Sequence, residues 1–124
     1  MDKISRILIL EDCAADADMV EFELQDAQIN FMSKRVIKEE DFLQSLQEFC
    51  PDLILSDYEL PQYNGSLALA AAKARCPSTP FILVTGAIKA NLSSEIINAG
   101  ASDFVGKSQL DKLVPAVRKV LEEL

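Results

Sequence analysis

The side chains of this 124-residue chain that could do chemistry are mostly acidic, and they come directly after short apolar segments. Glu11 and Asp12 follow the first such segment, and Asp57 follows another. Thr85 and Lys107 follow two later ones. Three clustered carboxylates would repel one another by roughly a few kcal/mol at an effective dielectric constant of ~20. A proton on one carboxyl or a hard divalent cation such as Mg²⁺ would relieve that repulsion.

An aspartate beside Mg²⁺ can act as a nucleophile toward phosphorus and form an aspartyl phosphate. Phosphoryl transfer depends mostly on positioning and on neutralising charge. Mg²⁺ and Lys107 would neutralise the phosphoryl oxygens, and the Thr85 hydroxyl could donate a hydrogen bond. Gly86 has no side chain and would let a backbone N–H approach closely. The pattern is therefore compatible with phosphoryl transfer to one of these carboxylates.

Composition excludes several other kinds of site. The chain has no histidine, which removes the commonest metal ligand and every Ser-His or Cys-His arrangement. The odd number and wide spacing of Cys13, Cys50 and Cys76 do not indicate a disulfide framework or a zinc site. The net charge of −8 argues against nucleic acid as a partner. No apolar run is long enough for a signal peptide or a membrane span, so we expect a cytoplasmic protein without a membrane partner.

Short apolar runs alternate with helical patterns along the chain, which predicts buried parallel strands separated by helices. The runs are residues 7–10, 31–37, 53–55, 81–84 and 104–105. The helical patterns are residues 17–27, 42–49, 67–74, 92–99 and an apolar stripe from Leu110 to Leu124 with Pro115 in its first turn. This organisation predicts a single α/β domain over residues 1–124, with an open parallel sheet and helices on both faces. Ligands bind at the carboxyl ends of the strands in such sheets, which is where the candidate residues stand.

Four segments, each at the end of a predicted strand, carry a family resemblance. They are ILILED (7–12), DLILSDYELP (52–61), PFILVTG (80–86) and GASDFVGK (100–107). In this order and spacing they resemble the response-regulator receiver family of two-component signalling, in its stand-alone single-domain form, over the whole chain. The resemblance implies a flavodoxin-like, doubly wound sheet of five parallel strands in the order 2-1-3-4-5.

The resemblance also implies roles for the acidic residues and the lysine. Asp57 matches the phosphoacceptor, and Lys107 matches the lysine that pairs with the phosphoryl group. Glu11 and Asp12 would hold Mg²⁺ together with Asp57. The backbone carbonyl of Glu59 would be a further metal ligand.

Two more positions match the parts of the family that change shape. Thr85 matches a switch hydroxyl that moves toward the phosphoryl group. Phe104 matches an aromatic residue that turns inward when Thr85 moves, although it lacks the hydroxyl of the tyrosine often found there. The implied donor is a histidine kinase or a histidine phosphotransfer protein. The implied target is a downstream protein that binds the face formed by the fourth helix, fifth strand and fifth helix. Such a receiver is not an enzyme beyond its own phosphoryl uptake and autodephosphorylation.

Other interpretations compete with this one. Taken singly, Asp57 also suits a turn or a helix cap, and Phe104 suits a core position. A small phosphatase with an aspartyl-phosphate intermediate would place its nucleophile after the first strand and would need a substrate-capping segment. A receiver-like scaffold without phosphorylation would not require the complete set of acceptor, metal ligands and lysine. A flavin-binding protein would need a glycine-rich phosphate cradle in the first loop, where residues 11–16 are acidic instead.

Overall fold

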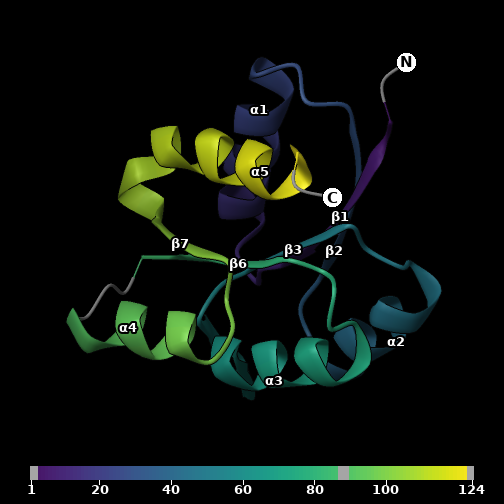
Figure 1. Ribbon diagram of the computed structural model, residues 1–124, viewed down its shortest axis with the longest axis vertical. Coiled ribbons are helices and arrows are strands. Elements are labelled where there is room, and N and C mark those ends of the chain that lie inside the picture. The colour runs from purple at the N-terminus through teal and green to yellow at the C-terminus, as the bar shows by residue number, and fades with distance from the viewer. Residues whose placement is uncertain (1–2, 87–89, 123–124) are drawn as a thin grey trace.

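The computed structural model describes residues 3–86 and 90–122, which form a parallel β-sheet with helices on both faces (Figure 1). The strands of this sheet are β1 (Ser5–Leu10), β2 (Phe31–Val36), β3 (Leu53–Ser56), β6 (Phe81–Thr85) and β7 (Asp103–Gly106). The helices are α1 (Ala14–Asp26), α2 (Glu39–Glu48), α3 (Gly65–Arg75), α4 (Ala90–Asn98) and α5 (Leu113–Glu122). The sheet order is β2-β1-β3-β6-β7. Counted along the chain, these five strands have the order 2-1-3-4-5, so the predicted fold is confirmed.

The central strands are mostly apolar because helices cover both faces of the sheet. The hydrophobic side chains of β1, β3 and β6 are at most 3% exposed. Successive side chains of a strand point to opposite faces. Leu8, Ile54 and Phe81 therefore belong to the core under α2, α3 and α4. Ile9 and Leu55 belong to the core under α1 and α5. Figure 1 shows these two layers of helices on opposite sides of the sheet.

Local signals place the ends of two helices. Asn64 caps α3, because its Oδ1 accepts a hydrogen bond of 2.9 Å from the backbone N–H of Leu67. A Cβ at Gly65 would lie only 2.9 Å from the carbonyl oxygen of Asp57, so glycine lets α3 begin directly against the end of β3. Gly100 follows α4 with a φ of +115°, a conformation that favours glycine and ends the helix as predicted.

Two short elements have no counterpart among the predicted ones. A hairpin of β4 (Glu59–Leu60) and β5 (Tyr63–Asn64) follows β3, and it is too short to show a hydrophobic period. The predicted last helix is divided: Lys107–Lys112 form a 3₁₀-helix, and α5 begins only at Leu113. Pro115 lies in the first turn of α5, as predicted. Leu124, which the predicted stripe included, lies outside the described residues.

The α-helices of the described residues are 9 to 13 residues long. A helix needs about 20 predominantly apolar residues to cross the hydrocarbon core of a bilayer. Accordingly, no helix in the described part of the chain has the length and apolar character to span a membrane.

Candidate functional site

Three carboxylates meet at the carboxyl edge of the sheet. β1 and β3 are adjacent and parallel, with Leu10 opposite Ser56, so the residues that follow them emerge side by side. Glu11, Asp12 and Asp57 each contribute an oxygen to a group in which these atoms lie within 4.8 Å of one another. Glu11 and Asp57 are 4% and 8% exposed, whereas Asp12 is exposed to solvent.

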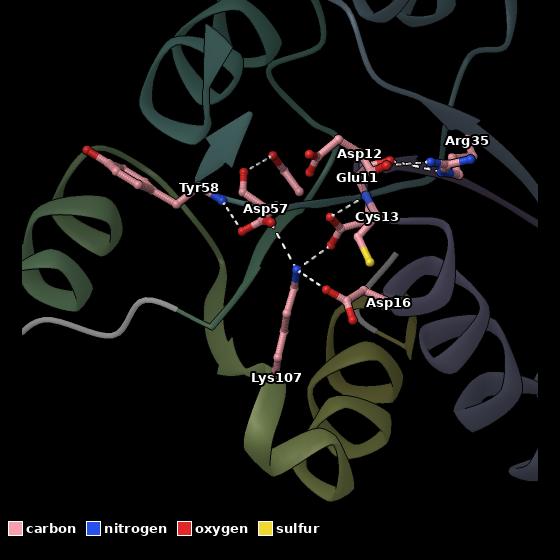
Figure 2. A network of polar contacts seen from close by, with 9 residues as sticks. Glu11, Asp12, Cys13, Asp16, Arg35, Asp57, Tyr58 and Lys107 are labelled. Atoms are coloured by element: carbon pink, nitrogen blue, oxygen red, sulfur yellow. Dashed lines mark hydrogen bonds and ion pairs between the residues drawn. The ribbon is translucent and has the colours of Figure 1, made fainter. Parts of the chain in front are cut away.

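Lys107 reaches into this group from the end of β7 (Figure 2). Its Nζ lies 2.7 Å from Glu11 Oε1 and 2.9 Å from Asp57 Oδ2. The third ion-pair partner of Lys107 is Asp16, in the first turn of α1, whose Oδ2 lies 2.7 Å from the same nitrogen. An ammonium group has three N–H donors, so these three carboxylates occupy its full donor capacity.

Backbone amides orient the two buried carboxylates. The N–H of Cys13 donates to Glu11 Oε2 at 3.2 Å, and the N–H of Tyr58 donates to Asp57 Oδ1 at 2.7 Å. Each carboxylate therefore directs one oxygen toward a backbone N–H and the other toward Lys107. The arrangement holds both side chains in defined positions before any ligand binds.

Burial and ion pairing act in opposite directions on the pKa values of this site. Burial raises the pKa of Glu11 from 4.5 to about 6, although the hydrogen bonds from Lys107 and Cys13 act to lower it. Burial also opposes the charged form of Lys107, but its carboxylate partners outweigh that effect and hold its pKa above the usual value. The hydrogen bond from Lys107 lowers the pKa of Asp16. The lysine is therefore cationic at neutral pH, and Glu11 is held as an anion at a free-energy cost.

The donor set fits a hard divalent cation. Carboxylate oxygens are the ligands that Mg²⁺ prefers, and a magnesium site typically uses one or two carboxylates together with water and a phosphate oxygen. Lys107 is hydrogen-bonded to oxygens of Glu11 and Asp57, so the ammonium group and a metal ion would share them. Glu59 lies in β4 with its side chain exposed. A role of its carbonyl as a metal ligand stays a prediction.

The two predicted switch residues lie on the neighbouring strands β6 and β7. Thr85 ends β6, is 1% exposed and pairs with Gly106, the residue before Lys107. Phe104 lies on β7, is partly buried and packs against the core under α2, α3 and α4. The structure thus places Thr85 beside the site and Phe104 three residues before its lysine. Their motion stays a prediction.

Sequence reasoning missed two residues that contact the site. Asp16 carries only a weak signal, since acidic residues are common in the first turn of any helix. Arg35 carries none, because it lies on β2 and belongs to no motif. Its Nε donates to the Glu11 carbonyl at 2.9 Å, and its Nη2 donates to the Asp12 carbonyl at 2.8 Å (Figure 2).

Comparison with known proteins places this geometry in a family. A sequence model of the response regulator receiver domain matches residues 7–118. The chemotaxis protein CheY of Listeria monocytogenes is 28% identical over an alignment of 101 residues, and the match covers 71% of this chain and 85% of CheY. The transcriptional regulatory protein PhoP of Escherichia coli K12 is 28% identical over 102 residues, which are 82% of this chain but only 45% of PhoP. The chain thus spans less than half the length of that relative.

Among solved structures, the signal receiver domain of a LuxO repressor protein from Vibrio parahaemolyticus superposes with a TM-score of 0.87 at 25% identity. The match covers 98% of this chain and 92% of that domain. The sequence match and the structural match both cover nearly the whole length of the chain. The chain therefore belongs to the response regulator receiver domain family.

Proposed function

We propose that this chain is a phosphoryl-accepting switch and that Asp57 carries the phosphoryl group. Receiver domains take phosphoryl groups from histidine kinases, act on downstream targets and generally bind Mg²⁺ at an acidic cluster. The proposal rests on one observation: the oxygens of Glu11, Asp12 and Asp57 meet at the sheet edge, and Lys107 is hydrogen-bonded to two of these residues. We expect the donor to be a histidine kinase or a histidine phosphotransfer protein.

In the proposed step, an oxygen of the Asp57 carboxylate attacks the phosphorus of a phosphohistidine on the donor. The new O–P bond forms as the P–N bond breaks, and the electron pair stays on the imidazole nitrogen of the donor, which takes up a proton. Tyr58 N–H holds the other carboxylate oxygen at 2.7 Å and limits rotation of the side chain. Lys107 already lies 2.9 Å from Asp57 Oδ2, so a small movement would bring its ammonium group to a phosphoryl oxygen.

Glu11, Asp12, Asp57 and the Glu59 carbonyl are the residues that we propose to hold Mg²⁺. When bound, Mg²⁺ supplies positive charge to the phosphoryl oxygens and to the crowded carboxylates. The burial and exposure of these side chains would favour binding of the metal ion. Burial of Glu11 and Asp57 keeps bulk water from screening their charges, and the exposed Asp12 lies on the solvent side, from which a metal ion would enter.

We further propose that phosphorylation changes the equilibrium between two conformations of the surface formed by α4, β7 and α5. The Thr85 hydroxyl would move toward the phosphoryl group, and Phe104 would turn into the space beneath α4. Their positions on adjacent strands beside Lys107 support this coupling. A downstream protein would read the new surface. The cytoplasmic location and the action of residues 1–124 as one domain stay predictions.

The test is exposure to a small acyl phosphate with Mg²⁺, followed by intact mass. We expect one added phosphoryl group, which is absent in Asp57→Asn and absent without metal. Asp103→Asn is a matched control, because Asp103 Oδ1 accepts a hydrogen bond of 2.8 Å from Phe104 N–H just as Asp57 does from the residue after it. Labelling that persists in Asp57→Asn would contradict the assignment.

The same experiment separates the competing functions. Sustained turnover of a generic phosphate ester would favour a phosphatase with an aspartyl-phosphate intermediate. Absence of labelling from any donor, together with unaltered partner binding, would favour a scaffold.

A further inference from the structure

Arg35 holds two consecutive carbonyl groups of the loop that carries the acidic pair. Its guanidinium donates from Nε to the Glu11 carbonyl at 2.9 Å and from Nη2 to the Asp12 carbonyl at 2.8 Å. We propose that Arg35 is a positioning residue that sets the direction of the Asp12 side chain for Mg²⁺. This inference rests on the metal site of the proposed function.

The two hydrogen bonds act on the two peptide planes that flank Asp12. The Glu11 carbonyl belongs to the plane that precedes the Asp12 Cα, and the Asp12 carbonyl belongs to the plane that follows it. Because peptide groups are planar, fixing both planes fixes φ and ψ of Asp12 and therefore the direction of its Cα–Cβ bond. Among the described residues, no hydrogen bond or ion pair holds the Asp12 carboxylate itself. The two Arg35 hydrogen bonds therefore help to aim this exposed side chain, together with the Cys13 N–H, which lies in the second of these planes and donates to Glu11 Oε2 at 3.2 Å.

The parallel pairing of β1 and β2 explains why Arg35 reaches this loop. Arg35 stands opposite Ile9, and the Glu11 N–H continues the ladder by donating to the Val36 carbonyl at 3.1 Å. The two carbonyls lie two and three residues beyond Ile9, or about 7 to 10 Å along the strand direction. A long side chain is needed to span this distance. The planar guanidinium offers several N–H donors in fixed directions, which an ammonium group does not.

Charge and positioning predict opposite effects of Arg35 on the metal. A guanidinium beside the site repels a divalent cation, so its charge alone weakens Mg²⁺ binding. Holding the Asp12 backbone in a binding conformation strengthens Mg²⁺ binding, because the ligand is then ordered in advance. Whether removal of the Arg35 side chain weakens or strengthens Mg²⁺ binding therefore tells which of the two effects is larger.

The experiment measures Mg²⁺ affinity by calorimetric titration of the intact chain and of Arg35→Gln and Arg35→Lys. We expect both variants to bind Mg²⁺ about tenfold more weakly, the range in which residues that orient metal ligands act. Lys34→Gln is the matched control, because Lys34 is an exposed cation on the same strand and, among the described residues, forms no hydrogen bond or ion pair with residues 11–13. Its affinity should not change.

A second readout needs no metal. Amide hydrogen exchange in the presence of a chelator should be faster for residues 11–13 in both Arg35 variants and unchanged in Lys34→Gln. Circular dichroism checks that the variants remain folded, and the lysine variant serves if the glutamine variant does not fold.

Specific outcomes overturn the inference. Unchanged or tighter Mg²⁺ binding by Arg35→Gln would show that charge, and not positioning, dominates. Wild-type Mg²⁺ affinity in Arg35→Lys would show that the several N–H donors of the guanidinium are not required. Unchanged amide hydrogen exchange of residues 11–13 in the Arg35 variants would show that the two hydrogen bonds do not restrain the loop. A wild-type chain that binds no Mg²⁺ would overturn the proposed metal site and this inference with it. If the wild type binds and the variants match it, only this inference fails.

Discussion

Glu11→Gln tests whether burial of the acidic cluster acts against stability. Burial raises the pKa of Glu11 from 4.5 to about 6 in the metal-free protein. The folded chain therefore holds this proton more tightly than the unfolded chain does. The contribution of protonated Glu11 to the free energy of unfolding is fully present below pH 4.5 and is lost as pH rises through about 6. A shift of roughly 1.5 pKa units corresponds to about 2 kcal/mol.

The assay is urea unfolding of wild type and Glu11→Gln between pH 4 and about 7.5 with a chelator present. Glutamine has nearly the shape of a protonated glutamate and does not titrate in this range. The ionisable groups remote from Glu11 are common to both proteins and largely cancel in the difference. We expect the wild type to lose about 2 kcal/mol relative to Glu11→Gln as pH rises through this window. Glu40→Gln, at an exposed position of α2, is the control and should show no such trend.

A pH-independent difference between wild type and Glu11→Gln would refute the reasoning, because it would mean that folding leaves the Glu11 pKa unchanged. Saturating Mg²⁺ provides a further check. A bound cation favours the ionised carboxylate, so the pH dependence should move to lower pH in wild type. The apparent Mg²⁺ affinity should correspondingly weaken below about pH 6, where Glu11 is protonated in the metal-free protein.

Three further substitutions test separate contacts. Asp16→Asn should speed labelling by a small acyl phosphate roughly two- to fivefold, because it frees one donor of Lys107 and removes a negative charge; slower labelling by intact mass would contradict this. Gly65→Ala should lower the free energy of unfolding in urea by about 1–3 kcal/mol, because the added Cβ would lie 2.9 Å from a backbone carbonyl oxygen. Gly86→Ala is the control, because a Cβ added there would lie 3.9 Å from Cδ of Lys107, an ordinary van der Waals distance, and an equal loss of stability would refute the steric argument. Asn64→Ala should lose about 1 kcal/mol by the same assay with the loss of the α3 cap, and an unchanged stability would show that the cap contributes nothing.

Several features of the fold and the site were predictable from local sequence. The apolar runs and the helical periods between them predicted the sheet and its two helical layers, because both patterns depend only on spacing along the chain. The placement of Glu11, Asp12 and Asp57 at one edge followed from their positions after parallel strands, whose carboxyl ends lie on the same side. Gly100 likewise marked the end of α4 through a conformation that few other residues adopt.

Tertiary structure alone decided which partners these residues have. Lys107 pairs with Asp16 across 91 positions, and Arg35 reaches the Glu11 carbonyl across 24. Such contacts depend on strand register and on how α1 packs over the sheet, neither of which appears in local spacing. The raised pKa of Glu11 has the same origin, since it comes from burial by residues remote in sequence. Sequence determined which side chains arrive at the edge of the sheet, and packing decided how they are paired, oriented and charged there.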